Sequence, residues 1–181
     1  MQEKLPIRKY PRLKDYDYSQ YGPYFVTLCI KDKRNLLGRV DVGSGFHARP
    51  FVELTDLGVA VQKTIEYIYT NDKRVEIQQY VIMPNHVHMI VALNTAGYGS
   101  CTAEHGSCTV GRGSPTLQAV VGRIKSYTTK LWNEMYGTKH EIFWQRSFHD
   151  HIIRSESDYQ KIWQYIDENP MRWMEDCYYT K

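Results

Sequence analysis

The stretch 80–93, Y-V-I-M-P-N-H-V-H-M-I-V-A-L, decides the fold. It ends one run of β-forming residues, turns at Met-Pro-Asn and continues as a second apolar strand, so it predicts an antiparallel hairpin. Residues two apart in a strand point to the same face. His86 and His88 therefore share a face, where two imidazoles can hold one divalent metal ion. Two histidines hydrogen-bonded at a strand start are the structural alternative, and the spacing alone does not separate the two.

Hydrophobic periodicity on either side of this stretch predicts the other elements. We expect strands over 24–30, 74–83, 86–93 and 143–153, and helices over 56–71, 115–136 and 156–168. Thr55 and Ser114 are the expected N-caps of the first two helices, and Ser155 with Asp158 has the spacing of a capping box for the third. Gly137 ends the second helix. The glycine-rich and proline-containing stretch 38–50 is expected to be a loop.

The resulting order, β-α-β-β-α-β followed by a helix, predicts an α+β fold of the ferredoxin-like (split βαβ) type. This is an antiparallel sheet with helices on one face, plus a C-terminal helix. Strand 86–93 would lie centrally in the sheet. Its histidines would face either the helices or the open side, depending on the register.

Length and composition indicate one globular domain: the chain has 181 residues, of which 42% are hydrophobic and 24% charged. The net charge of +3 says little about partners. Basic residues are nevertheless concentrated in an N-terminal arm, 1–23, and in the region 111–139. These regions suit a phosphate backbone, although solvated faces look similar. No run of 18 apolar residues occurs, so no membrane association is expected.

Four scattered cysteines without a C-x-x-C motif indicate free thiols and a cytoplasmic protein. Cys101 and Cys108 lie in a stretch of small residues, 95–114, that has too little apolar surface to pack. We expect a mobile loop there. A zinc site that pairs these two cysteines with the histidines is an alternative.

The helix over 115–136 contains K-S-Y-T-T-K, which places a tyrosine among basic side chains. If this helix packs beside strand 86–93, the hydroxyl of Tyr127 can reach a metal held by the histidines. Tyrosine has a pKa near 10, so a nearby cation must help to remove its proton before it can act as a nucleophile. Arg123, Lys125 and Lys130 would position phosphates. The alternative is a half-buried tyrosine on an amphipathic helix.

Four motifs in order, over roughly residues 20–173, carry a resemblance to a known family. They are V-I-M-P-N-H-V-H, K-S-Y-T-T-K, F-W-Q-R-S-F-H-D-H-I-I-R and Y-I-D-E-N-P. Together they resemble the single-tyrosine HUH transposases, and within them the REP-associated tyrosine transposases. The resemblance implies an enzyme that cuts and rejoins single-stranded DNA at REP-like hairpins, in a bacterial cytoplasm and associated with the nucleoid.

The resemblance also implies roles for single residues. Tyr127 would be the nucleophile that forms a 5′-phosphotyrosine and frees a 3′-OH, while His86 and His88 would bind Mg²⁺ or Mn²⁺. Arg123, Lys125 and Lys130 would contact single-stranded or hairpin DNA. The chain then divides into the arm 1–23, a transposase domain 24–155 and a C-terminal helix and tail 156–181, acting as a monomer or a homodimer.

One departure from the family concerns the third metal ligand. Relatives carry it, often as Gln, one helical turn after the tyrosine, where this chain has Leu131. Asp150, His149, His151 or water are the open alternatives. The Y-I-D-E-N-P segment is interpreted as docking the last helix. Two other functions stay open: an inactive hairpin DNA- or RNA-binding module on the same fold, and a metal-dependent hydrolase that uses water.

Overall fold

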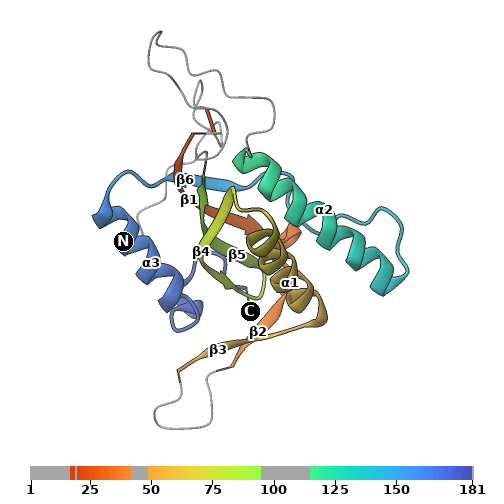
Figure 1. Cartoon of the computed structure of the whole chain (residues 1–181). Coiled ribbons are helices and arrows are strands. Elements are labelled where there is room, and N and C mark those ends of the chain that lie inside the picture. Colours follow the sequence, from red (N-terminus) through yellow and green to blue (C-terminus); the bar gives the residue numbers. More distant parts are fainter. Residues whose placement is uncertain (1–16, 19, 42–48, 95–114, 181) are drawn as a thin grey trace.

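The structure of the protein is a computed structural model that describes residues 17–18, 20–41, 49–94 and 115–180 (Figure 1). Most of the expected basic arm and the whole stretch 95–114, with Cys101 and Cys108, lie outside the described residues. The expectations about the arm, the mobile loop and its cysteines therefore stay predictions.

Four antiparallel strands form the main sheet. They are β1 (Gly22–Cys29), β4 (Val75–Ile82), β5 (His86–Leu93) and β6 (His149–Ile152), in the order β4-β5-β1-β6. Helices α1 (Asp56–Asn71) and α2 (Leu117–Tyr136) lie on one side of the sheet, and α3 (Glu156–Glu168) lies on the other (Figure 1). With β5 and β1 as the two central strands, this is the predicted ferredoxin-like arrangement with an added C-terminal helix.

Strand β5 separates two hydrophobic clusters. Every residue of β5 is buried, because the strand has neighbours on both edges and helices over both faces. Val87 and Met89 belong to the large core that also contains the buried faces of α1 and α2, whereas Ile90 packs in a second cluster with Ile166 of α3. Because side chains alternate along a strand, His86 and His88 face the α3 side. This settles the orientation that the sequence left open.

Capping side chains set the helix starts. The hydroxyl of Thr55 accepts a hydrogen bond from the backbone N–H of Gly58, and that of Ser155 accepts from Asp158, as predicted for α1 and α3. The expected start of α2 at residue 115 is wrong. Thr116 takes the cap position because its hydroxyl accepts from the N–H of Ala119, and the helix begins at Leu117.

Two expected segments differ from the structure. The supposed loop 38–50 contains strand β2 (Gly38–Asp41), which pairs with β3 (Phe51–Leu54) in a separate two-stranded sheet. Arg39 and Glu53 face each other across these two strands and form an ion pair. The expected strand 143–153 is regular only as β6, because the residues before it are held against α2: the Trp144 indole N–H donates to the hydroxyl of Thr128.

Short 3-10 turns follow β1 (Lys31–Lys33) and α3 (Trp173–Glu175). The helices of the described residues do not combine the length and the apolar content that a bilayer crossing requires.

Candidate active site

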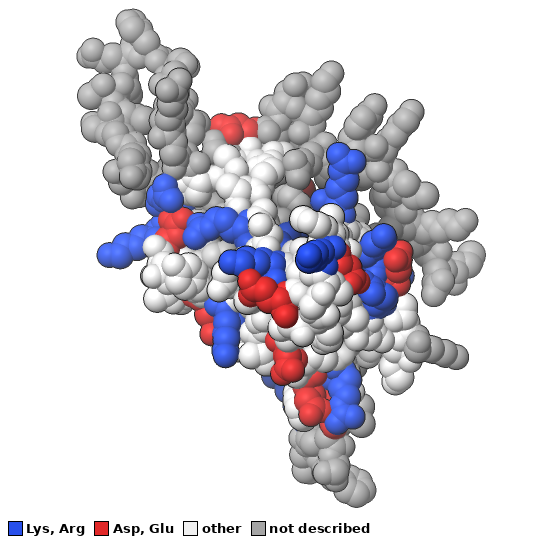
Figure 2. Space-filling model, turned by 90° about the vertical axis from the view of Figure 1, so that its right-hand side faces the viewer, with Lys and Arg blue, Asp and Glu red and all other residues white. Residues whose placement is uncertain are grey.

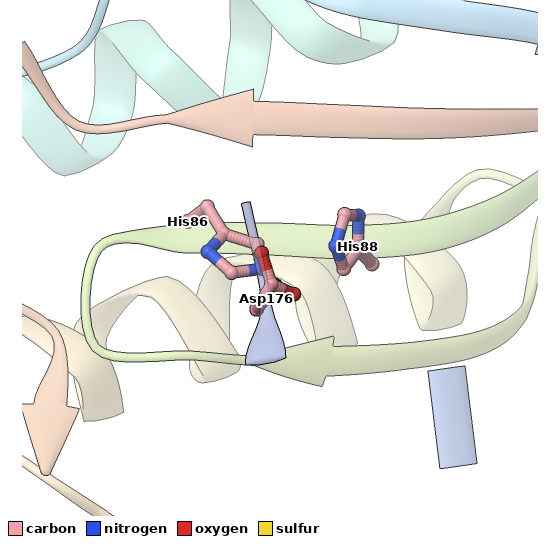
Figure 3. A group of neighbouring side chains, drawn as sticks. All are labelled: His86, His88 and Asp176. Atoms are coloured by element: carbon pink, nitrogen blue, oxygen red, sulfur yellow. The ribbon is translucent and has the colours of Figure 1, made fainter. Parts of the chain in front are cut away.

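His86 and His88 lie side by side beneath the C-terminal segment (Figure 3). Their ring centroids are 4.4 Å apart, and the two residues are 0% and 1% exposed. The structure thus brings together the two predicted metal ligands, on one face of a central strand. Polar side chains this deeply buried require partners, and their partners define the chemistry of the site.

Hydrogen bonds orient both rings in the same way. Nδ1 of His86 lies 2.9 Å from the side-chain oxygen of Asn85, and Nδ1 of His88 lies 2.9 Å from the hydroxyl of Thr27. An amide oxygen only accepts, so Nδ1 of His86 carries the hydrogen and Nε2 keeps its lone pair. The side-chain amide of Asn85 is itself fixed, because its NH₂ group donates to the carbonyl oxygens of Lys33 and Tyr178. A histidine oriented through Nδ1 is a typical metal ligand through Nε2.

Burial also keeps both rings neutral. It lowers the pKa of His86 to about 4, and it lowers the pKa of His88 well below the ordinary value for histidine, with the neighbouring His86 adding to the effect. At neutral pH both imidazoles are therefore uncharged. Only the neutral form offers the lone pair that a metal ion needs.

Asp176 completes a group with metal-ligand chemistry. The ligand atoms of His86, His88 and Asp176 all lie within 4.8 Å of one another, and Oδ2 of Asp176 is 4.0 Å from Nε2 of His86. Figure 3 shows the carboxylate between the two imidazoles. It is held there by the side-chain amide of Asn169, which donates to Oδ2 over 3.1 Å, and by the backbone N–H of Tyr178, which donates to Oδ1 over 2.7 Å.

Two buried atoms at this site have a free lone pair that a cation could bind. Among the described residues, Nε2 of His86 and Oδ1 of Asn169 are buried side-chain atoms without a hydrogen-bond partner. Leaving such an atom without a partner costs about 1–3 kcal/mol. Imidazole nitrogens with carboxylate and amide oxygens are a donor set for divalent transition metals such as Mn²⁺. The residues present fit a divalent cation.

A tyrosine hydroxyl does reach the histidines, but it belongs to Tyr165 of α3. Its oxygen lies 3.2 Å from Nε2 of His88 and 3.5 Å from Oδ2 of Asp176. Burial, and after it the charge of Asp176, raises the pKa of the Tyr165 phenol. Asn169 lies one helical turn after Tyr165, at the helix C-cap. Both residues belong to Y-I-D-E-N-P, so the motif that was interpreted as docking the helix contained the signal for both.

Tyr127, by contrast, lies on the other side of the sheet. It is 54% exposed and lines a groove between α1 and α2, whose inner faces pack against Val87 and Met89. The expectation that its hydroxyl meets the histidines is wrong. The helix does pack beside β5, but against the strand's opposite face, because histidines and core residues alternate along it.

The three predicted DNA-contacting residues lie on α2 in different settings. Nζ of Lys125 donates to the backbone carbonyls of Gln145 and Ser147, which anchors the segment before β6. Arg123 pairs with Asp72 at the C-terminal end of α1, over 2.9 Å. Lys130, with a side chain that is 70% exposed, lies 3.8 Å from Glu134. Of the three, Lys130 is therefore the most available to a ligand, because Lys125 and Arg123 are both engaged in short contacts within the protein.

The expected third ligands on β6 lie away from the histidine pair. Asp150 pairs with Val26 in register, so it faces the α1 and α2 side. His151 is bound to Asp158 of α3 over 2.8 Å. His149 is exposed and shares the face of His88, but Thr27 of β1 lies between them. Asp176, to which Asn169 donates a hydrogen bond, lies at the histidine pair instead.

The C-terminal segment closes the site. The ring of Tyr178 lies 4.5 Å from that of His86, and Trp173 lies 5.9 Å from it. Lys33 donates to the carbonyl of Cys177, and Thr180 donates to the carbonyl of Lys33. The segment over 173–180 therefore covers the histidines. Of the four cysteines, Cys29 and Cys177 are described, and both are free thiols.

No family model matches the chain. The sequence is 35% identical over 179 residues to an uncharacterized protein of Haemophilus influenzae, and the match covers 96% of this chain and 93% of that protein. Among solved structures, a REP-associated tyrosine transposase bound to a REP hairpin superposes with a TM-score of 0.56 and 22% identity. That match covers 90% of this chain and 74% of the other.

At 22% identity the structural likeness concerns the fold, whereas the Haemophilus match is close enough and long enough to show common family membership. The chain thus belongs to one family with the Haemophilus influenzae protein, and its fold is that of the REP-associated tyrosine transposase.

Proposed function

We propose that the protein cleaves and rejoins single-stranded DNA through a 5′-phosphotyrosine on Tyr165, with a divalent cation at the histidine pair. One observation carries the proposal: the Tyr165 hydroxyl lies 3.2 Å from Nε2 of His88, in a site that contains a second imidazole with an unsatisfied Nε2. A buried pair of neutral imidazoles next to a phenol provides a cation site and a nucleophile in one place.

His86, His88 and Asn169 would hold the cation, because all three are buried residues of β5 and of the C-cap of α3. Applied to Tyr165, the family pattern of a third ligand one helical turn after the tyrosine falls on Asn169 and its unsatisfied oxygen. When bound, a divalent cation supplies stabilisation of negative charge on a phosphate oxygen.

Asp176 is then the group that a DNA phosphate replaces. Its carboxylate is the only contribution of the 173–180 segment to the cluster, and that segment must move before DNA can reach the buried histidines. An anionic oxygen of the scissile phosphate has the same charge and donor chemistry as Oδ2 of Asp176. We infer that the closed segment and the substrate compete for one position.

The reaction requires few groups. The Tyr165 oxygen attacks phosphorus and gives its proton to water. The bond between phosphorus and the 3′ oxygen breaks, and the leaving 3′ oxygen takes a proton from water. The products are a 5′-phosphotyrosine and a 3′-OH. Attack by a 3′-OH on the phosphotyrosine rejoins the strand and restores the phenol. The solved transposase with this fold is bound to a REP hairpin, so we propose hairpin DNA with single-stranded flanks as the substrate.

A labelled hairpin with single-stranded flanks, incubated with Mn²⁺ and run on a denaturing gel, tests the proposal. We expect a protein–DNA adduct from the wild type and from Tyr127→Phe, and none from Tyr165→Phe. Peptide mapping of the adduct identifies the linked tyrosine. An adduct that persists in Tyr165→Phe and vanishes in Tyr127→Phe would overturn the assignment and favour the residue that the sequence resemblance implies.

The second candidate is a hairpin-binding protein on the same fold that does not cleave. The closed segment over the histidines favours it, since a site that stays covered binds no phosphate. Hairpin binding without any adduct, from the wild type and from a variant in which the segment is loosened, would support this candidate against the enzyme.

A further inference from the structure

We propose that the groove between α1 and α2, on the opposite side of the sheet from Tyr165, binds unpaired nucleotides of the DNA substrate. This rests on the proposed function and extends it with a second contact surface. Three residues of the K-S-Y-T-T-K motif of α2, Ser126, Tyr127 and Lys130, line this groove and have no part in the site at the histidines.

The groove is large and lined by both helices. Its volume is about 1210 Å³, and its small residues, Ala60 of α1 with Ala119 and Gly122 of α2, keep the space between the helices open. A Cβ at Gly122 would meet nothing within 4 Å. A cleft of this size accommodates planar groups that a flat helix surface would not hold.

Two tyrosines of the groove have the exposure expected of stacking platforms. Tyr67 of α1 is 64% exposed and Tyr127 of α2 is 54% exposed, so each ring presents most of its surface to solvent. A tyrosine of the hydrophobic core is much less exposed: Tyr24 is 0% exposed. An exposed aromatic ring in a groove offers a face on which any base stacks, without regard to sequence.

Two lysines of the groove suit a phosphate backbone. Its charged lining residues are Lys63, Arg123, Lys130 and Asp56, and because Arg123 is paired with Asp72, Lys63 and Lys130 are the cations available to a phosphate. Lys130 is held only weakly, 3.8 Å from Glu134, and so can turn toward a phosphate. Figure 2 shows basic side chains spread over this flank of the molecule, with acidic ones beside several of them.

The surface continues past the groove. A second hollow of about 490 Å³ shares Ser126 and Lys130 with it. This hollow adds Lys139 and Glu134, together with the polar side chains of Thr129 and Asn133. The two hollows form a track along α2 that combines cations, hydrogen-bonding groups and aromatic rings. An extended strand fits such a track, with its bases against the rings and apolar walls and its phosphates beside the lysines.

The test measures binding of a fluorescent oligothymidylate by anisotropy. EDTA and a Tyr165→Phe background prevent cleavage, so the result does not depend on whether the proposed chemistry occurs. The double variant Tyr67→Ala/Tyr127→Ala is compared with Tyr69→Ala, which removes a tyrosine of α1 that is 56% exposed and does not line the groove. Circular dichroism checks that all variants fold.

We expect the double variant to bind at least about tenfold more weakly, since stacking is worth about 1–3 kcal/mol per base. Tyr69→Ala should bind like the parent. Lys63→Glu/Lys130→Glu should flatten the dependence of log Kd on log salt by about 0.7 per lost phosphate contact. Equal affinities for the double variant and Tyr69→Ala would overturn the proposal. If the double variant kept its affinity for the oligothymidylate but changed its sedimentation coefficient, the proposal would also be wrong. The groove would then be an interface between protein chains.

Discussion

The phenol oxygen of Tyr165 lies 3.2 Å from Nε2 of His88, although the two residues are 77 positions apart in the chain. Helix α3 crosses the sheet on the face to which the histidines of β5 point, and it carries Tyr165 over them. The contact joins a phenol to the imidazole pair that is suited to hold a cation. Whether the site can break a phosphodiester depends on that cation, and the first prediction concerns it.

Metal binding should stabilise the folded protein through the two histidines. At a Mn²⁺ concentration of 100 times Kd, linkage adds about 2.7 kcal/mol to the free energy of unfolding. This corresponds to a rise in Tm of about 2–4 °C for each kcal/mol. His86→Ala and His88→Ala should lose the shift, measured by differential scanning calorimetry with Mn²⁺ and with EDTA. His149→Ala, an exposed histidine on β6, is the matched control and should keep it. Equal shifts in all three variants would place the metal elsewhere.

Stability should fall on acidification through a window set by His86. Burial lowers its pKa to about 4, whereas the unfolded chain has a value near 6.5. Between these two values the unfolded state binds more protons, so the free energy of unfolding decreases as the pH falls from 6.5 to 4. The expected loss from this residue is about 3 kcal/mol. Urea unfolding in EDTA at several pH values measures it, and His86→Gln should show a shallower slope. A slope unchanged by this substitution would contradict the prediction.

Much of the fold follows from local patterns, whereas the site depends on a contact that local patterns do not contain. The predicted bounds of β5, α1 and α3 agree with the structure, because alternation and capping are properties of neighbouring residues. The distance between Tyr165 and His88 depends on which face of the sheet each helix covers. From sequence, the basic neighbours of Tyr127 make it the predicted nucleophile, and Tyr165 is not among the candidates. Alternation along β5 excludes Tyr127 only once the positions of α2 and α3 are known.

Gly58 should not tolerate a side chain, because α1 closely approaches the chain before β2 at this residue. A Cβ at this position would lie 2.0 Å from the carbonyl oxygen of Leu37, which is backbone and cannot turn aside. We expect Gly58→Ala to lower the free energy of unfolding by about 1–3 kcal/mol, as overpacking does. Gly122→Ala in α2 is the matched control. It meets nothing within 4 Å and should raise stability by about 0.5–1 kcal/mol. Urea unfolding of both variants gives the comparison, and a neutral Gly58→Ala would show that the two segments are free to separate.

Asp176→Asn distinguishes two roles of this carboxylate: it occupies the place of the DNA phosphate, or it is a metal ligand. If the carboxylate occupies the place of the DNA phosphate, its loss weakens the closed segment and removes a negative charge 3.5 Å from the Tyr165 oxygen. That charge raises the pKa of the phenol, so the variant should have a lower phenol pKa, seen by NMR of ring-labelled tyrosine. Adduct formation should be several-fold faster, and the Tm shift with Mn²⁺ should remain, because His86, His88 and Asn169 are intact.

Asp167→Asn is the matched control for this charge change. Asp167 also belongs to the C-terminal part of the chain but binds Arg49 on the surface, so its loss should leave the adduct rate unchanged. A loss of activity in Asp176→Asn would support the other role of the carboxylate. If the adduct and the Mn²⁺ shift disappear together, the carboxylate is an obligatory metal ligand. The segment over 173–180 would then have to stay in place while DNA enters beside it, and competition between Asp176 and the phosphate would be wrong.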